Sequence, residues 1–276
     1  MIDLRRLKKQ LVPTFVSNAK RQLLDSNCRR TKREFSRIHA LPRFEEGCTD
    51  LLGTEIVFTD GPSFVSMYYE IFVQKHYEFR VCRKDPRIID AGANIGLSAI
   101  YFSRCYPDGR ITAFEPDPYL FGVLQRNLNS ANVQNVESHC EAVWTENCEL
   151  SFDTDRALSG RLVSRPVESD KNIRVEAVDM RRYLTEPIDL MKFDIEGAEL
   201  DVLEHCSDKL DSVDKLFVEY HSFIDKPQRV GDLFSILQDA GFRLQVKSIH
   251  PPKQPFMGLK NAGGMDMQLN IYGFRD

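Results

Sequence analysis

Hydrophobic positions change their spacing several times between residues 86 and 240. Short apolar runs of strand length are followed by segments in which apolar residues recur at helical spacing, and glycine, asparagine or proline separates the two. The predicted strands cover 88–90, 111–114, 136–140, 188–194 and 213–220, and the predicted helices cover 97–106, 119–131, 200–210 and 230–240. Such alternation predicts an α/β fold with a parallel sheet and right-handed crossovers.

Three further segments depart from this alternation. They are a prelude (strand 54–58, helix 65–74, strand 77–82), a β excursion (strands 149–153 and 173–178) and a C-terminal pair of strands (242–249 and 266–274) joined by the loop 250–264. A polar loop within the excursion suggests that it lies near the mouth of the substrate site. Two strands joined by a loop at the end of a wound sheet predict a hairpin with an antiparallel edge.

The first forty residues are strongly basic. They hold eleven Lys/Arg against three Asp/Glu, and their apolar spacing predicts helices near 2–11 and 14–38. We interpret the basic face as the solvated side of a helical lid or oligomer arm, which favours a homodimer. A membrane-surface helix is the alternative, although its apolar face, formed by Leu4, Leu7 and Leu11, is small.

The composition is that of a soluble globular protein. Of 276 residues, 42% are hydrophobic and 28% are charged, which fits one large domain with an extension. We expect residues 1–53 to form a basic helical N-terminal extension and residues 54–276 to form a single domain.

Charge, apolar runs and cysteine spacing exclude several classes of protein. The formal net charge of −4 does not favour nucleic acid as a partner. No apolar run reaches the length of a transmembrane segment and no signal peptide is visible, so we expect a cytoplasmic protein. The seven cysteines form no C-x-x-C pair, which argues against a disulfide framework and against a zinc site.

A glycine-containing motif, Asp90-Ala-Gly-Ala-Asn-Ile-Gly96, connects the predicted strand 88–90 to the predicted helix 97–106. A turn of this kind at the end of a strand holds nucleotide-type cofactors in open α/β sheets. In a dinucleotide-binding loop a second glycine lets the backbone approach the pyrophosphate, whereas this chain has Asn94 at that place. With the acidic Asp90 at the strand end, the loop suits a ligand that has an amino group and no phosphate, such as S-adenosylmethionine.

A second acidic residue, Glu115, follows the next predicted strand, 111–114. It lies 25 residues after Asp90, near the spacing of about 20 that is usual for a carboxylate that binds ribose hydroxyls. Pro116 ends the strand because proline cannot donate to a ladder. We favour the ribose role for Glu115, and a solvated acid at a strand end is the alternative.

The other dense motif is Lys192-Phe-Asp-Ile-Glu-Gly-Ala-Glu199. Strand alternation places Lys192, Asp194 and Glu196 on one side, at the carboxyl end of a central strand, where ligands bind in open α/β sheets. Gly197 allows a turn into the next helix, and Glu199 suits the positive N-terminus of that helix. The alternative is that Lys192 pairs with Asp194 or Glu196 and merely fixes the turn.

These motifs together resemble the FkbM-type methyltransferases. The resemblance rests on Ile-Asp-x-Gly-Ala-Asn-Ile-Gly, Phe-Glu-Pro and Lys-Phe-Asp-Ile-Glu-Gly-Ala-Glu, and it covers roughly residues 54–275. It implies the class I methyltransferase (Rossmann-like) fold, with a seven-stranded, mostly parallel sheet whose last strand is antiparallel. It also implies S-adenosylmethionine as methyl donor and a hydroxyl oxygen as the usual acceptor.

The resemblance also implies a set of cofactor-binding residues. The loop meets the methionine moiety, Glu115 takes the ribose, and Glu141 and Ala142 lie beside the adenine. The full expected set is Asp90, Gly92, Ala93, Asn94, Gly96, Glu115, Pro116, Glu141, Ala142 and Asp194.

For catalysis we single out Asp194, Glu196, His221 and Lys192. A base that accepts the proton of the acceptor hydroxyl speeds such a reaction by roughly 10²–10⁴-fold. His221 follows a predicted strand, 213–220, and so reaches the same rim as the two carboxylates; a histidine simply bonded to a neighbouring carboxylate is the alternative. A divalent metal held by Asp194, Glu219 and His221 is conceivable, but the spacing does not require it and we predict no metal.

The expected activity is therefore S-adenosylmethionine-dependent O-methylation of a sugar, a glycan or a small natural product. Two alternatives stay open: an NAD(P)-dependent oxidoreductase and a non-catalytic module that binds the cofactor. The missing second glycine and the lack of a Tyr-x-x-x-Lys pair count against the first, and the acidic cluster at 192–199 counts against the second.

Overall fold

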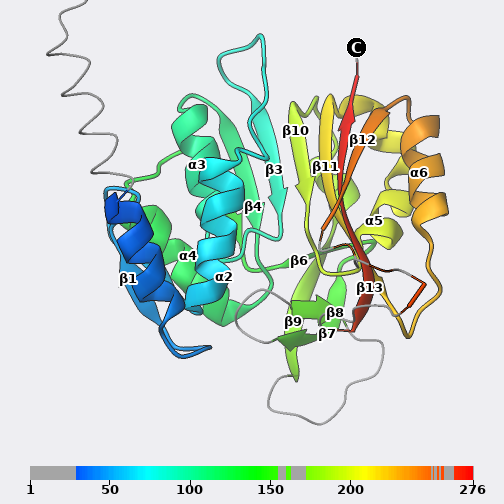
Figure 1. The fold of residues 1–276 in the computed structure, drawn as a ribbon. Coiled ribbons are helices and arrows are strands. Elements are labelled where there is room, and N and C mark those ends of the chain that lie inside the picture. Colours follow the sequence, from blue (N-terminus) through cyan, green and yellow to red (C-terminus); the bar gives the residue numbers. More distant parts are fainter. Residues whose placement is uncertain are drawn as a thin grey trace, which may run out of the picture.

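Seven strands form the central sheet in the part of the chain that the computed structural model describes (Figure 1). Their spatial order is β12 (Arg243–Ser248), β13 (Met265–Phe274), β11 (Lys215–Phe223), β10 (Leu190–Phe193), β3 (Arg87–Ala91), β4 (Arg110–Phe114) and β5 (Val136–His139). All neighbours pair in parallel except β13, which is antiparallel to both β11 and β12. This is the class I methyltransferase arrangement, so the predicted fold class is confirmed.

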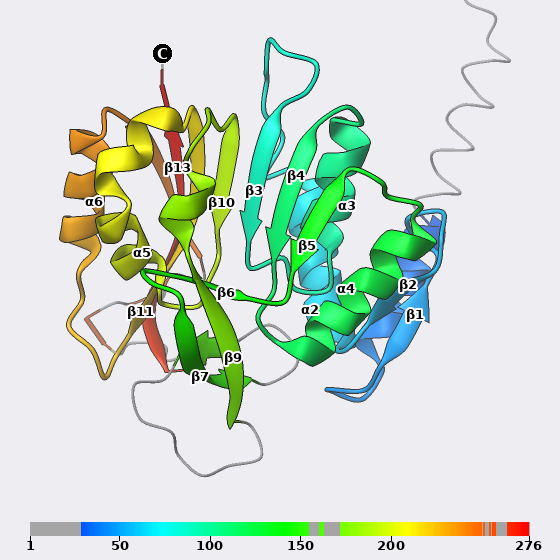
Figure 2. The same ribbon diagram turned by 180° about the vertical axis from the view of Figure 1, so that it is seen from behind.

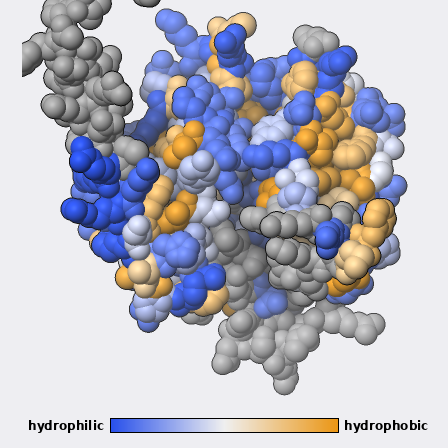
Figure 3. All heavy atoms as spheres, viewed as in Figure 1, coloured by the Kyte–Doolittle hydropathy of each residue, from blue (hydrophilic) through white to orange (hydrophobic). Residues whose placement is uncertain are grey.

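The C-terminal hairpin forms, but its antiparallel strand is not at the edge as predicted. β13 inserts between β11 and β12 because it is long enough to pair along both, and Ile271 near its middle is fully buried. β12 is therefore the edge strand, and most of its residues are exposed. Apolar residues gather on this side of the molecule, on the right in Figure 3.

Helices cover both faces of the sheet (Figures 1 and 2). Successive residues of β3 point into different cores: Ile88 packs with α3 (Leu97–Cys105) and α4 (Pro118–Ser130), and Ile89 packs with the layer of α5 (Glu199–His205) and α6 (Val230–Asp239). The predicted helix 200–210 is divided in two, α5 and the 3₁₀ segment η4 (Ser207–Ser212). The two layers leave the carboxyl ends of the central strands accessible.

The prelude contains the hairpin of β1 (Gly47–Thr49) and β2 (Ile56–Phe58), then α2 (Gly61–Tyr68) and the π-helical η2 (Tyr69–Val73). The helix starts earlier than predicted because Asp60 caps it, accepting a hydrogen bond from the Ser63 backbone N–H at 3.0 Å.

The predicted strand 77–82 is wrong, since this described segment forms no strand. Tyr77 is instead buried against the rings of Phe102 and Phe217. The Phe79 backbone N–H donates to Tyr106 Oη rather than to a neighbouring strand. The alternation of apolar residues here reflects packing of aromatic side chains.

The β excursion is confirmed as a separate sheet beyond the carboxyl ends of the central strands (Figure 2). Among the described residues it contains β6 (Ala142–Trp144), β9 (Asn172–Asp179), β7 (Cys148–Thr154) and β8 (Gly160–Leu162). The short β6 and β8 were not predicted. A 3₁₀ turn, η3 (Met180–Tyr183), leads back to the central sheet.

The structure describes residues 29–154, 160–162, 172–249, 251, 254, 256–257 and 264–275. The predicted helix 2–11 and most of 14–38 lie outside these residues, as do parts of the excursion loop and of 250–264. A helix does cover 29–39, and its Ile38 is fully buried in the core beside α2 and α3. No helix in the described ranges has the length and apolar character needed to cross a bilayer.

Candidate active site

A cavity of about 510 Å³ lies at the carboxyl ends of β3, β4, β10 and β11. Its wall includes eleven of the residues singled out from the sequence: Gly92, Ala93, Asn94, Glu115, Pro116, Glu141, Ala142, Lys192, Asp194, Glu196 and His221. The other two, Asp90 and Gly96, do not line it. One cavity thus joins the two motifs, which are about a hundred residues apart in the chain.

The loop after β3 is held open by left-handed backbone. Gly92, Asn94 and Gly96 have φ angles of 83°, 50° and 87°. A Cβ on Gly92 would lie 1.8 Å from the backbone oxygen of Asp194, so only glycine fits against the second motif. Asn94 takes the place of a glycine because asparagine tolerates the left-handed conformation better than most residues.

Glu115 connects this loop to the end of β4. One carboxylate oxygen accepts from the Asn94 backbone N–H at 2.9 Å, and the other accepts from the Asp117 N–H at 3.0 Å. The residue is only 5% exposed, so the alternative of a solvated acid is wrong. Burial raises the pKa of Glu115 to about 8.

Asp90 lies beneath the cavity wall rather than on it. It is fully buried, accepts from Ser98 Oγ at 2.5 Å, and lies 3.1 Å from Lys192 Nζ. Asp90 acts on the wall through Lys192, and its contact with the amino group of a ligand, which the sequence suggests, stays a prediction.

Lys192 occupies the position between the two motifs. Its Nζ donates to the Gly92 backbone oxygen at 2.8 Å and lies 3.6 Å from Asp194 Oδ2. Burial opposes the ammonium charge, but the carboxylates of Asp90 and Asp194 outweigh it and raise the pKa of Lys192. The pairing with Asp194 that we considered from the sequence is therefore present, and the main partner is Asp90.

The chain leaves strand geometry after Phe193, and the predicted alternation stops there. Glu196 and Gly197 have left-handed φ angles of 56° and 98°. In consequence Ile195, which alternation placed on the opposite side, also lines the cavity beside Asp194.

Sequence reasoning missed the main role of Glu199. The residue is 1% exposed, and its carboxylate accepts from the backbone N–H groups of Ile195 and Gly197 at 3.0–3.1 Å and pairs with His221 Nδ1 at 2.9 Å. Its place just after the turn glycine, in the first turn of α5, was the available signal, because a glutamate there can reach back to free N–H groups.

His221 is 5% exposed and is surrounded by carboxylates. Its Nε2 lies 3.6 Å from Glu219, 3.7 Å from Glu196 and 3.3 Å from the Gln268 amide nitrogen. Burial opposes protonation, but the charges of Glu196 and Glu199 outweigh it and raise the pKa of His221 well above its usual value. The geometry thus matches the alternative of a histidine bonded to neighbouring carboxylates.

We call Asp194, Glu196, Glu199 and Glu219 the acidic cluster. Burial raises the pKa of Asp194 to about 7 and that of Glu196 to about 8. For Glu219 burial acts in the same direction, but the contact with His221 outweighs it and the pKa is lowered. Carboxyl groups with a pKa near neutrality can exchange a proton with a ligand at working pH.

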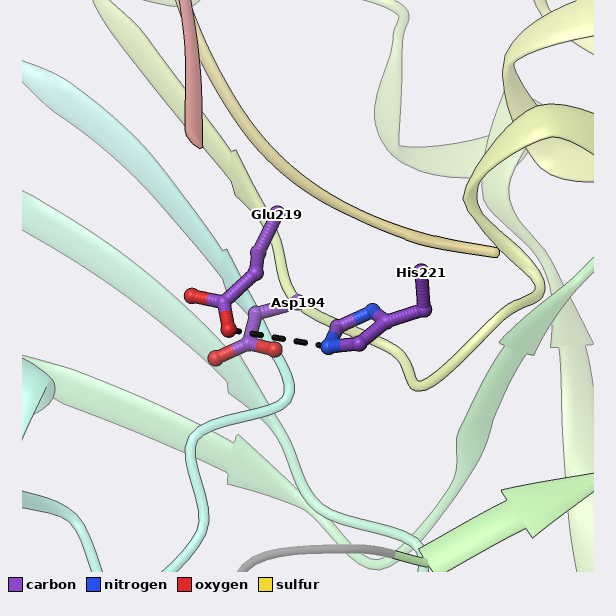
Figure 4. A group of neighbouring side chains, drawn as sticks. All are labelled: Asp194, Glu219 and His221. Carbon is purple, nitrogen blue, oxygen red and sulfur yellow. Dashed lines mark ion pairs between the residues drawn. The ribbon is translucent and has the colours of Figure 1, made fainter. Parts of the chain in front are cut away.

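Two of these carboxylates and the imidazole of His221 also form a group of possible metal ligands (Figure 4). One donor atom each from Asp194, Glu219 and His221 lies within 4.8 Å of the others. Asp194 follows the end of β10, and Glu219 and His221 lie on the neighbouring parallel strand β11, which places all three on one side of the cavity.

Residues 90–244 match the family model described as the methyltransferase FkbM domain. Among curated proteins, Methyltransferase 1 of Beauveria bassiana is 28% identical over 206 residues, which are 66% of this chain and 82% of the relative. Methyltransferase sdnD of Sordaria araneosa is 31% identical over 173 residues, 50% of this chain and 67% of the relative. Hexuronic acid methyltransferase AglP of Haloferax volcanii is 27% identical over 169 residues, 60% of this chain and 67% of the relative.

Proposed function

This chain belongs to the FkbM methyltransferase family, and from that premise we propose that it transfers a methyl group from S-adenosylmethionine to a hydroxyl oxygen of a sugar, a glycan or a small natural product. The observation that carries the proposal is the single cavity that holds both the loop with Glu115 and the acidic cluster. The first can hold an adenosyl cofactor, and the second can accept the proton that the acceptor hydroxyl must lose.

The cofactor side of the cavity fits S-adenosylmethionine. Glu115 faces the cavity and can accept from both hydroxyls of a ribose. Asn94 leaves the loop without the glycine that a pyrophosphate needs, which disfavours NAD(P) and an oxidoreductase. Gly92 and Ala93 would meet the methionine part, and Glu141 with Ala142 would meet the adenine. When bound, the cofactor supplies a methyl group on a cationic sulfur, and the carboxylate of Glu219, whose pKa is lowered, against the effect of burial, by its contact with His221, complements that charge.

On the acceptor side of the cavity, side chains of the protein align the acceptor hydroxyl and accept its proton. Asp194 and Glu196 line the cavity at the end of β10, where a hydroxyl between them could give up its proton. Alignment of reacting groups can contribute about 7–11 kcal/mol to the rate. The name of the Haloferax volcanii relative supports a sugar acid as one acceptor to test first. A homodimer, a cytoplasmic location and the division at residue 53 stay predictions.

Calorimetry and product analysis test the proposal. We expect the protein to bind S-adenosylhomocysteine and not NADH. With S-adenosylmethionine labelled in the methyl group, we expect label in at least one member of a panel of hexuronic acids, neutral sugars and hydroxylated natural products. Asp194→Asn should bind the product cofactor and transfer methyl groups slowly. Binding of NADH alone would refute the proposal, and cofactor binding without any methylated acceptor would favour the non-catalytic module.

A further inference from the structure

We propose that Asp194, Glu219 and His221 bind a divalent cation of the Mg²⁺ or Mn²⁺ type, which holds the acceptor hydroxyl in the cavity. The role for the ion rests on the proposed methyl transfer, whereas the site rests on geometry. The three donor atoms lie within 4.8 Å of one another (Figure 4). Ligands that share one ion at about 2.0–2.6 Å lie no more than about 5 Å apart, so the triad fits with little movement.

The orientation of His221 is that of a metal ligand. Glu199, which is outside the triad, accepts from two backbone N–H groups and therefore serves as the acceptor for Nδ1–H as well. With Nδ1 paired to Glu199, Nε2 is directed at Glu219 and the cavity, where a bound cation would replace the proton on Nε2. Histidines that bind metals usually donate their other ring N–H to a carboxylate in this way.

Charge balance points to a cation at the same place. The four carboxylates of the acidic cluster outnumber the two cationic side chains beside them, His221 and Lys192, and Lys192 is shared with Asp90 and the Gly92 backbone oxygen. Buried like charges are costly unless a positive group compensates them. The amide of Gln268, which is neutral, contacts both Glu219 and His221 and would have to move to admit an ion.

An ion at this position explains how an alcohol is activated. Three protein ligands leave part of the coordination shell of a hard cation for oxygens of the acceptor, which suits a substrate with two neighbouring oxygens, such as a vicinal diol or a hydroxy acid. The ion lowers the pKa of the bound hydroxyl. The proton of that hydroxyl passes to Glu196, and the hydroxyl oxygen forms a bond to the methyl carbon of the cofactor. The bond between this carbon and the sulfur breaks, and its electron pair stays on sulfur.

Binding of Mn²⁺ to the full chain after treatment with EDTA tests the site directly. Electron paramagnetic resonance should show bound Mn²⁺ that Mg²⁺ displaces. Glu219→Gln and Asp194→Asn should each weaken Mn²⁺ binding by at least about tenfold, because loss of a ligand should cost no less than the roughly 10–100-fold that is typical of losing an outer-shell partner. The matched control is Glu70→Gln, which removes another carboxylate from the cavity wall, outside the triad, and should retain the ion. Thermal melting identifies any variant that does not fold.

The outcomes separate this proposal from that of methyl transfer. Absence of bound Mn²⁺ in the unsubstituted chain, or equal binding by all three variants, overturns the metal site. Full methyl transfer in excess EDTA also overturns it, while the methyltransferase proposal stands. If S-adenosylhomocysteine does not bind and no acceptor is methylated, the proposed function fails, and the Mn²⁺ measurement still decides whether the triad holds a cation.

Discussion

The carboxylate of Glu199 and the imidazole of His221 form a buried contact of 2.9 Å that joins α5 to β11. The same carboxylate accepts from the backbone N–H of Gly197, within the loop that carries Asp194 and Glu196. One side chain therefore fixes both the position of the acidic loop and the proton on Nδ1 of His221. Glu199 is accordingly a positioning residue.

Substituting Glu199→Gln should lower both stability and turnover. A buried donor left without an acceptor costs about 1–3 kcal/mol, so urea unfolding should show a loss of that size. Loss of a partner that orients a functional histidine should reduce the rate of methyl transfer by about 10–100-fold, with the affinity for S-adenosylhomocysteine unchanged. The ¹⁵N chemical shifts of His221 should show that Nδ1 no longer carries a fixed proton.

The control for this change is Glu204→Gln in the same helix. Glu204 is exposed and, among the residues that the structure describes, its side chain pairs with Arg229 alone, at 3.4 Å, so stability and turnover should stay as they are. If the ¹⁵N shifts of His221 are unchanged in Glu199→Gln, Glu199 holds the loop in place but does not fix the proton on Nδ1 of His221.

The cofactor side of this site could be predicted from the sequence more fully than the side with the acidic cluster. The loop with Asn94 and the strand-end Glu115 could be located because strand, turn and helix are local patterns with a known spacing. The contact of Glu199 with His221 spans two elements, and no local pattern encodes it. The same limit applies to Asp90. Its carboxylate pairs with Lys192 on the neighbouring strand β10, and no local pattern in the sequence shows this pairing.

The fold could be predicted for the same reason. The prediction failed where packing between segments distant in the sequence decides the local structure. The alternating strands and helices were located within a few residues. The segment 77–82 has the apolar spacing of a strand, yet Tyr77 and its neighbours pack as aromatic core. The place of β13 depends on which two strands it pairs with, which the order of elements along the chain does not state.

Removal of the Glu115 carboxylate should weaken cofactor binding selectively. A hydrogen bond to a charged group contributes about 1–3 kcal/mol, so Glu115→Gln should raise the Kd for S-adenosylhomocysteine by roughly 5- to 150-fold. Isothermal titration calorimetry measures this change. Glu137→Gln, on the adjacent strand β5 with a side chain that is 75% exposed, is the control and should bind normally. Unchanged affinity in Glu115→Gln would rule out the ribose role.

Glu115 should also make stability depend on pH in the cofactor-free protein. Burial raises its pKa to about 8 from the usual 4.5, so between these values the folded protein holds a proton that the unfolded chain has released. The contribution to stability is therefore full below about pH 4.5 and is lost as the pH rises through 8. In urea unfolding from pH 5 to 9, the unsubstituted protein should lose stability relative to Glu115→Gln. If the free energy of unfolding changes with pH in the same way in both proteins, the pKa of Glu115 is not raised.

The left-handed backbone of Asn94 predicts a difference between two small substitutions. Asn94→Ala should cost about 1–2 kcal/mol relative to Asn94→Gly, because alanine pays the steric cost of a positive φ and glycine does not. Asn132, after α4, has nearly the same φ, 52°, but does not line the cavity. The pair Asn132→Ala and Asn132→Gly should show the same difference in stability without any change in cofactor affinity. Loss of cofactor affinity in both Asn94 variants relative to the unsubstituted protein, with no difference in stability between them, would show instead that the Asn94 side chain is itself a ligand contact.

The buried pair of Lys192 and Asp90 should show strong coupling in a double-mutant cycle. Lys192→Met leaves a fully buried carboxylate with Ser98 as its remaining side-chain partner, and breaking such a pair costs about 3–5 kcal/mol. Lys192→Met combined with Asp90→Asn should recover most of that loss, because no uncompensated charge then stays buried. Chemical unfolding of the three variants measures the coupling. If the single and double variants are equally unstable, Lys192 acts through its contact with Gly92 rather than through Asp90.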